Sequence, residues 1–406
     1  MFVNYLRAGP RTTALNLAVA RVVLGVYLAW KILSYDWGAV SDWPFPIYRD
    51  ERIYWLFTSG PLNGHLELLA WILGGLCVLF IVGLWLRWVS FCMAALLIYL
   101  GGNLHTLDSV GGTEAIFIAT YFVVLFGLYS EYDVLTLDRG RRRESPLALR
   151  NTLATAGAAR YALPQLRWSI VVVAVLYFFS GMEKVVRGPV WEWARPETMA
   201  RFLTHRREIY HTDPPLADLM LESELLLFGA EAGTIVLEVG MLVAIVAGIA
   251  VTPVMVGLFA MHAGIALTLN PFFLDSMIFL CLFLGWDRLL ALGASEQRVD
   301  VVYDDTNSGL MQLLVVVSHL DVSDSLEFHP SSDPSWSVRG DLRVTIDGES
   351  YRGYEGVRCL LSACSRLTAP VATALGLPGV RSIGQAWYRR ITAHDPLSAS
   401  AHSVGD

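Results

Sequence analysis

Lysine is almost absent from this sequence, which has only Lys31 and Lys184 among its 406 residues. Charge of either sign is scarce as well, because Asp, Glu, Lys and Arg together make up 17% of the chain. A soluble domain usually has about 25% charged residues. This composition argues against an ordinary soluble protein, and with a net charge of −7 nothing is basic enough to suggest nucleic-acid binding.

The sequence also lacks the short motifs typical of disulfide, metal, nucleotide and nucleophile sites. Its five cysteines form no C-x-x-C pair, and their odd number and scattered positions argue against a disulfide framework. We expect them to behave as small buried hydrophobic residues. Metal-ligand spacing, a glycine-rich nucleotide loop and a nucleophile elbow are missing. No cleavable signal peptide is evident, because the first apolar run is of membrane length and contains Arg21.

Apolar residues, in contrast, are abundant and unevenly placed. Hydrophobic residues make up 54% of the chain and fill its first 295 residues. From Glu296 onward the sequence has 14 acidic residues and 9 arginines, a net charge of −5. The pattern therefore predicts a transmembrane domain over 1–295 and an acidic, water-facing domain over 296–406.

A spanning helix needs about 20 consecutive, mostly apolar residues. Eight segments of the chain meet this condition, and the last two are separated by the turn signal Asn270-Pro271. The predicted spans are 14–33, 66–86, 88–107, 111–130, 168–187, 225–249, 251–270 and 271–292.

The arginines in the short loops predict the orientation of these spans. Loop 131–167 has seven arginines, the strongest cytoplasmic mark in the chain, and Arg7 and Arg11 place the N-terminus on the same side. We therefore expect a multi-pass protein of the cell membrane with both termini in the cytoplasm. Loop 188–223 is then external, and its mixture of arginines, acidic residues and aromatics predicts short helices lying on the membrane surface.

This topology places polar residues of several predicted helices in the outer half of the bilayer. An ionisable residue inside a membrane is a candidate for a functional site. The residues are Asn103, His105, Asp108, Glu114, Glu183, Lys184, Glu231, Glu238, His262 and Asn270.

Structural explanations compete with the functional one for these residues. Lys184 can extend to the outer headgroups, and His105 can serve as a hydrogen-bonded helix end. For Glu238 we favour pairing with Arg21, since buried charges are usually paired. His262 is more often a packed polar contact between helices. Both kinds of explanation remain open for the group as a whole.

The segment YFFSGMEKVVRGPVW, residues 177–191, resembles the helix end that has the catalytic lysine in vitamin K-dependent gamma-glutamyl carboxylases. More broadly, most of residues 10–295 resemble the HTTM-type membrane domain that these enzymes share with many prokaryotic proteins. The segment GGNLHTLDSVGG resembles the family's helix end with an Asn-x-His-like pattern.

The resemblance implies a lysine base that deprotonates a reduced quinone of the menaquinone type, with a histidine that positions or polarises the reacting groups. Lys184 matches the base and His105 the histidine, and we expect them to be the catalytic pair. Further expected cofactor-binding residues are Asn103, Glu231 and His262. The family has two adjacent lysines, but the first is Glu183 here. The large extramembrane region that binds the carboxylase's protein substrate is missing, so glutamate carboxylation is not implied.

The tail resembles a second family. VDVVYDDTNSGL predicts a strand and a turn before a helix over 308–320, and DLRVTIDGESYRGYEGVRCLL follows. This order resembles the DCC family of thiol-disulfide oxidoreductase-like proteins, which implies a thioredoxin-like fold. Asn307 and Leu310 stand where that family has its two cysteines. Because disulfide exchange requires a thiolate, the tail is expected to be redox-inactive and to bind a protein partner or stabilise the chain.

The sequence thus predicts a mostly helical membrane bundle of about eight transmembrane helices with a small C-terminal α/β domain. The leading function is a quinol-dependent carboxylase/epoxidase-like enzyme that uses Lys184 on a quinone supplied by the membrane lipid. The alternative is a non-enzymatic membrane scaffold, or a protein that binds a lipid or an ion. A transporter ranks third, because paired interrupted helices in two matching halves are missing. Replacement of Lys184 by methionine is expected to abolish activity and leave the fold intact.

Overall fold

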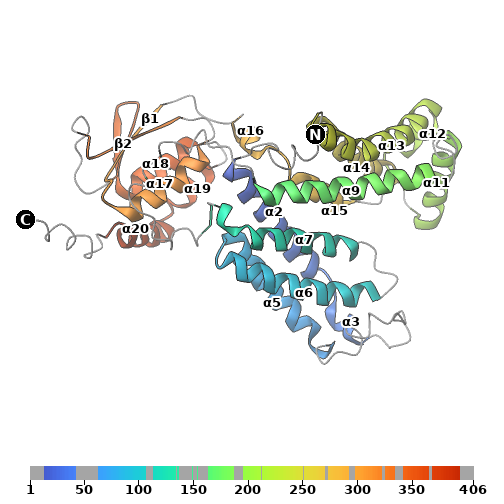
Figure 1. The fold of residues 1–406 in the computed structure, drawn as a ribbon, viewed down its shortest axis with the longest axis horizontal. Helices are drawn as coiled ribbons and strands as arrows, with labels where there is room; N and C mark the ends of the chain where they lie inside the picture. The colour runs from blue at the N-terminus through green and yellow to red at the C-terminus, as the bar shows by residue number, and fades with distance from the viewer. Residues whose placement is uncertain are drawn as a thin grey trace, which may run out of the picture.

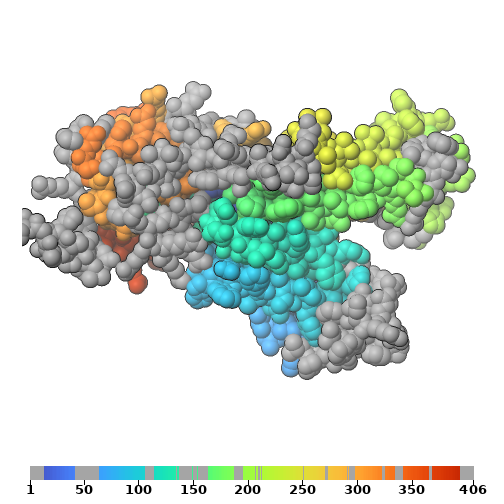
Figure 2. All heavy atoms as spheres, viewed as in Figure 1, coloured from blue at the N-terminus to red at the C-terminus, as the bar shows by residue number. Residues whose placement is uncertain are grey.

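The structure is a computed structural model, and its described residues form a long helical part and a small α/β tail on opposite sides of the molecule (Figures 1 and 2). The described residues are 13–42, 63–106, 113–133, 135–136, 149, 153, 163–186, 195–211, 213–249, 251–269, 273–291, 298–321, 325–333, 342–364 and 368–393.

Five of the described helices are long and apolar enough to cross a membrane, which is compatible with an integral membrane protein. They are α2 (Ala14–Leu33), α6 (Leu86–Thr106), α9 (Pro164–Val186), α13 (Glu224–Ala247) and α14 (Val251–Leu269). Two further apolar helices, α5 (Leu66–Val82) and α7 (Thr113–Leu128), have 17 and 16 residues. The described residues therefore contain fewer full-length spans than the eight predicted.

The predicted eighth span, 271–292, is not one continuous helix. It contains α15 (Leu274–Cys281) and α16 (Trp286–Ala291), which have only 8 and 6 residues. The indole N–H of Trp286 donates to the backbone carbonyl of Cys281 at 3.1 Å, and the backbone N–H of Trp286 turns back to Leu284 at 2.9 Å. Apolar composition alone predicted a single span here, but the side chain of Trp286 stabilises a turn in the middle of the segment.

Short helices occupy part of the loops between the long ones. Loop 188–223 contains α11 (Pro196–Tyr210) and α12 (Ala217–Leu221), at the ends of α9 and α13 that are farthest from the tail (Figure 1). The first long loop contains α3 (Trp37–Asp42) and η2 (Asn63–His65), and η3 (Ser130–Tyr132) follows α7. Most of loop 131–167, on which the predicted orientation depends, lies outside the described residues, as do Asp108 and Asn270.

An ion pair buried between α2 and the segment after α7 corrects one prediction. Arg21 lies 3.1 Å from Asp133, and the two side chains are 3% and 0% exposed. The guanidinium also donates to the backbone carbonyls of Phe80 and Leu135, at 3.2 and 2.6 Å. The predicted pairing of Arg21 with Glu238 is therefore wrong. The partner of Arg21 is Asp133, in a loop whose position the hydropathy pattern does not predict.

The tail contains a four-stranded mixed sheet, and its apolar core also includes Leu149 and Leu153 from the loop between α7 and α9. Its strands lie in the order β2-β1-β3-β4, with β1 and β2 parallel and the other pairs antiparallel. The elements are β1 (Val299–Tyr303), α17 (Ser308–Leu320), β2 (Leu326–Pro330), β3 (Arg343–Ile346), β4 (Glu349–Arg352), α18 (Gly353–Cys364), α19 (Ala369–Ala374) and α20 (Pro378–Thr392). The predicted strand, turn and helix over 308–320 are confirmed.

Candidate functional site

A cavity of about 1480 Å³ lies among the helices, lined mainly by α9, α11, α13, α14 and α15. Its wall is largely apolar, but several ionisable side chains face it. A large, mostly apolar cavity with a few convergent polar groups is the usual form of a ligand site. The cavity is therefore the strongest candidate for a functional site among the described residues.

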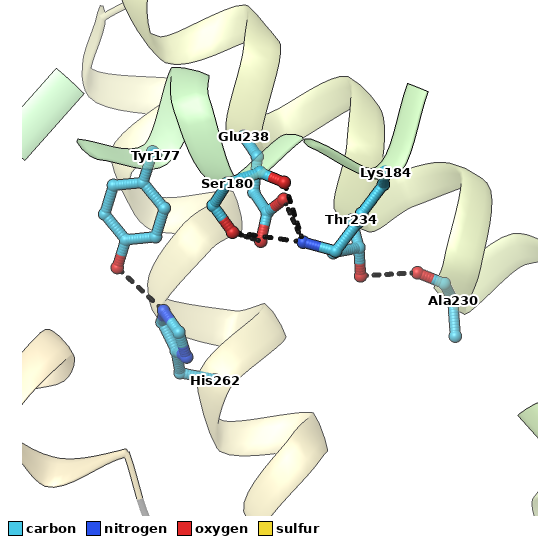
Figure 3. A network of polar contacts seen from close by, with 7 residues as sticks. All are labelled: Tyr177, Ser180, Lys184, Ala230, Thr234, Glu238 and His262. Carbon is cyan, nitrogen blue, oxygen red and sulfur yellow. Dashed lines mark hydrogen bonds and ion pairs between the residues drawn. The ribbon is translucent and has the colours of Figure 1, made fainter. Parts of the chain in front are cut away.

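In the cavity, Lys184 of α9 forms an ion pair with Glu238 of α13 (Figure 3). The Nζ atom of Lys184 lies 2.5 Å from Oε2 of Glu238, and the two side chains are 19% and 7% exposed. Ser180 completes the group, because its hydroxyl lies 3.1 Å from Nζ and 3.3 Å from Oε1 of Glu238. Lys184 thus faces its partner on another helix, and Glu183 is exposed.

The sequence of α9 explains how the two helices come so close. Ser180 and Lys184 are four residues apart and share one helix face. Between them lies Gly181, where an added Cβ atom would be 2.8 Å from Val239 Cγ2 and 3.0 Å from Glu238 Cβ. The missing side chain lets α13 approach α9 closely enough for the ion pair to form.

A second polar contact faces the same cavity and involves Tyr177, one helical turn before Ser180 on α9. The hydroxyl of Tyr177 lies 2.7 Å from Nε2 of His262 on α14 (Figure 3). The imidazole is 6% exposed and packs against the ring of Phe273, with 5.4 Å between ring centroids. Its Nδ1 atom has no hydrogen-bond partner among the described residues. His262 is thus an interhelical contact, as its structural explanation expected, and its second nitrogen is buried without a hydrogen-bond partner among the described residues.

The second lysine of the chain also lines the cavity. Lys31 of α2 lies 2.9 Å from Oδ2 of Asp275 on α15, and the hydroxyl of Tyr27 donates to Oδ1 at 2.8 Å. Neither Lys31 nor Asp275 was among the predicted site residues. The scarcity of lysine was the available signal, because both lysines prove to line the cavity.

Glu231 also lines the cavity, and it lies on the same face of α13 as Glu238. The Glu231 side chain is 1% exposed. The backbone N–H of Met199, in the first turns of α11, hydrogen-bonds to its carboxylate. The other oxygen, Oε2, has no hydrogen-bond partner among the described residues. A buried carboxylate oxygen without a donor is unfavourable, so this position suits a ligand that brings one.

The cavity thus brings together three of the five predicted site residues. Lys184, Glu231 and His262 line it, whereas His105 and Asn103 are not among its lining residues. The ring of His105 contacts Phe117, with 5.9 Å between centroids, and the amide of Asn103 donates to the backbone carbonyl of Tyr99 at 2.9 Å.

The tail has no thiol pair at the expected position. Asn307 caps α17, because its side-chain oxygen accepts from the backbone N–H of Leu310 at 3.0 Å. The thiols of Cys359 and Cys364 are free. Burial raises the pKa of both, and the charge of Glu349 raises that of Cys359 further. These thiols therefore stay protonated near neutral pH, where disulfide exchange would need a thiolate.

Comparison of the chain with family models, with curated proteins and with solved structures finds no match.

Proposed function

We propose that this protein is an integral membrane enzyme that deprotonates a reduced lipid quinone in the cavity. The observation that carries the proposal is the Lys184–Glu238 pair, an ammonium and a carboxylate facing a large and mainly apolar cavity. The resemblance of residues 10–295 to the quinol-dependent carboxylases supports the choice of substrate. A quinol with an isoprenoid chain can enter such a cavity from the bilayer.

The pairing of Lys184 with Glu238 suggests how a proton is accepted. The Lys184 amine does not face the cavity alone, because its Nζ lies 2.5 Å from the Glu238 carboxylate. The pair as a whole can still accept one proton. The quinol O–H bond breaks, the proton moves to the carboxylate of Glu238, and the quinolate charge is balanced by the Lys184 ammonium. In this scheme Glu238 is the acceptor and Lys184 stabilises the anion.

We assign the second polar contact with the quinol to His262 rather than to His105. His262 lines the cavity, and its Nδ1 atom has no partner among the described residues. His105 and Asn103 remain candidates for a structural role at the end of α6. Tyr177 supports the assignment, because its hydroxyl bonds Nε2 of His262 and thereby fixes the orientation of the ring.

For the tail we propose a thioredoxin-like domain that binds a protein partner rather than a redox enzyme. The strand order β2-β1-β3-β4, with a helix between parallel β1 and β2, supports this proposal. Asn307 and Leu310 supply a helix cap and a core residue where a redox domain has its two cysteines.

Lipid extraction and quinol-dependent oxygen uptake test the enzyme proposal. A quinone should co-purify with the protein, and mass spectrometry would detect it. Glu238→Gln should lower oxygen uptake about 100-fold or more, because a general base contributes that much. Glu224→Gln, an exposed change at the start of the same helix, is the matched control. Equal uptake by the wild type, Glu238→Gln and Lys184→Met would refute the proposal.

A membrane scaffold is the second candidate, and the ion pair itself favours it. Lys184 and Glu238 neutralise one another and connect α9 to α13, which is enough to explain their presence in a helical bundle. In that case no quinone co-purifies, and substitutions at the pair alter thermal stability alone.

A further inference from the structure

A second hollow lies beside the cavity, at the start of α11. It has a volume of about 800 Å³ and is lined by Arg195, Pro196, Glu197, Thr198 and Arg201. Thr198 and Arg201 also line the large cavity, so the two spaces share a wall. Helix α11, which lines both, lies at the ends of α9 and α13 that are farthest from the tail (Figure 1).

The start of α11 has the properties of an anion site. Arg195 is the N-cap residue and gives the helix no side-chain cap, and Pro196 follows it. The exposed guanidinium groups of Arg195 and Arg201 have no ion-pair partner among the described residues. Arginine guanidinium groups bind phosphate well, because their fixed N–H donors match its oxygens.

Glu231 independently requires that the ligand supply a hydrogen-bond donor. It is 1% exposed, and its Oε2 atom has no hydrogen-bond partner among the described residues. Its other contact, with the backbone N–H of Met199, places the carboxylate against the first turns of α11. A ligand at this point must therefore bring an N–H or O–H donor to Glu231 next to a group that suits the arginines.

The charges around the hollow limit the ligand further. Two basic groups, Arg195 and Arg201, and two acidic groups, Glu197 and Glu231, surround the hollow and the adjoining part of the cavity. A zwitterion matches this arrangement better than an anion does. A quaternary ammonium has no N–H to donate to the Glu231 oxygen, whereas a primary ammonium has three.

We propose that this composite site binds the phosphoethanolamine headgroup of a membrane lipid. Its phosphate contacts Arg195 and Arg201, and its primary ammonium donates to Glu231. The acyl chains follow apolar side chains of the cavity wall, among them Leu237 and Ile265. Glu231 precedes Glu238 by seven residues, about 10 Å along the helix, so the headgroup contacts and the proposed proton acceptor lie at different levels of one cavity.

Native mass spectrometry of the purified full-length protein tests the proposal. Phosphatidylethanolamine, phosphatidylcholine and phosphatidylglycerol with the same acyl chains are added separately in one detergent. We expect phosphatidylethanolamine to bind at least about tenfold more tightly than the other two, which corresponds to about 1.4 kcal/mol. Equal binding of phosphatidylglycerol would overturn the proposal, because it would show an anion site alone.

Two variants separate the contributions of the headgroup contacts. Glu231→Gln should abolish the preference for ethanolamine over choline, and Arg201→Gln should weaken binding of all three lipids. Glu222→Gln, exposed at the end of α12, is the control for the first variant. Because Arg201 is exposed, its variant also keeps the test valid if Glu231→Gln fails to fold. An unchanged preference in a folded Glu231→Gln protein would refute the assignment.

Free phosphoethanolamine distinguishes a lipid from a soluble phosphate ester. At equal concentration it should not displace the bound lipid, because the acyl chains add apolar contact area. Displacement would show that a soluble headgroup is the ligand and would overturn the lipid assignment. These measurements involve no quinol and no turnover, so their failure is distinguishable from a failure of the proposed enzyme activity.

Discussion

Lys31 and Lys184, the two lysines of the sequence, line the same cavity, and each is ion-paired with a carboxylate from another helix. Lys31 pairs with Asp275 and Lys184 with Glu238, at 2.9 and 2.5 Å. A charge inside a membrane-spanning bundle is costly unless it is neutralised. The chain thus limits its lysines to one internal space and provides a counter-ion for both.

The pairing changes what is expected of Lys184→Met. From the sequence, an apolar replacement should leave the fold intact, but in the structure it leaves the carboxylate of Glu238 without its cation. We expect Lys184→Met to lower stability by about 3 kcal/mol, the range for breaking a buried pair. Glu238→Leu in addition should restore most of the loss, because both charges are then gone.

The apparent melting temperature in detergent measures this effect for the two single variants and the double variant. The double variant should melt above Lys184→Met. Strictly additive destabilisation by the two changes would contradict the ion pair as a coupled unit.

Two glycines that end helices provide a matched test of the Arg21 site. Gly83 and Gly248 both have positive φ angles, of 71° and 70°. A Cβ atom at Gly83 would overlap Nη1 of Arg21 and the side chain of Thr136, whereas one at Gly248 would meet nothing within 4 Å. Gly248→Ala should therefore cost about 1 kcal/mol for backbone strain alone. Gly83→Ala should cost about 3 kcal/mol, because it also displaces Arg21 from Asp133.

Thermal unfolding of both glycine variants under identical conditions gives the comparison. Similar shifts in melting temperature would mean that Arg21 moves aside without loss, and that its pairing with Asp133 contributes little.

The buried thiol of Cys364 predicts a loss of tail stability in alkali. Burial raises its pKa, so the folded tail keeps the thiol protonated at a pH where the unfolded chain ionises it. Its contribution is complete below the unfolded pKa of about 8.5 and is lost progressively above it. Raising the pH from about 8 to about 10 should therefore destabilise the wild type more than Cys364→Val.

Hydrogen exchange of the β1 amides in the full-length protein measures this loss, with both proteins compared at each pH. Parallel behaviour of the two proteins across the range would rule out Cys364 as the titrating group.

The predicted orientation is tested by cysteine labelling in intact cells. Single cysteines replace Ser145, in the arginine-rich loop, and Thr204, exposed on α11, in a protein without other thiols. We expect a membrane-impermeant reagent to label position 204 only, because arginine-rich loops remain in the cytoplasm. Labelling of both positions from outside would refute the predicted topology.

The sequence by itself determined the broad class of this protein. Long apolar segments of nearly fixed length lie together in the first 295 residues, and bilayer thickness makes such segments helices. The β1 strand and α17 were also predictable, because β-branched residues, a turn and an apolar helical pattern follow one another locally.

Only the tertiary structure decided which polar groups meet. Hydropathy places a residue at a depth along a helix, but it does not state which neighbouring helix the residue faces. In the structure, Lys184 forms an ion pair with Glu238 rather than extending to the headgroups, and Arg21 forms one with Asp133 in a loop. His105 was predicted at the same depth, yet it does not line the cavity. Which side chains meet depends on how closely two helices approach, as α9 and α13 do at Gly181, and the sequence pattern of one helix does not give that distance.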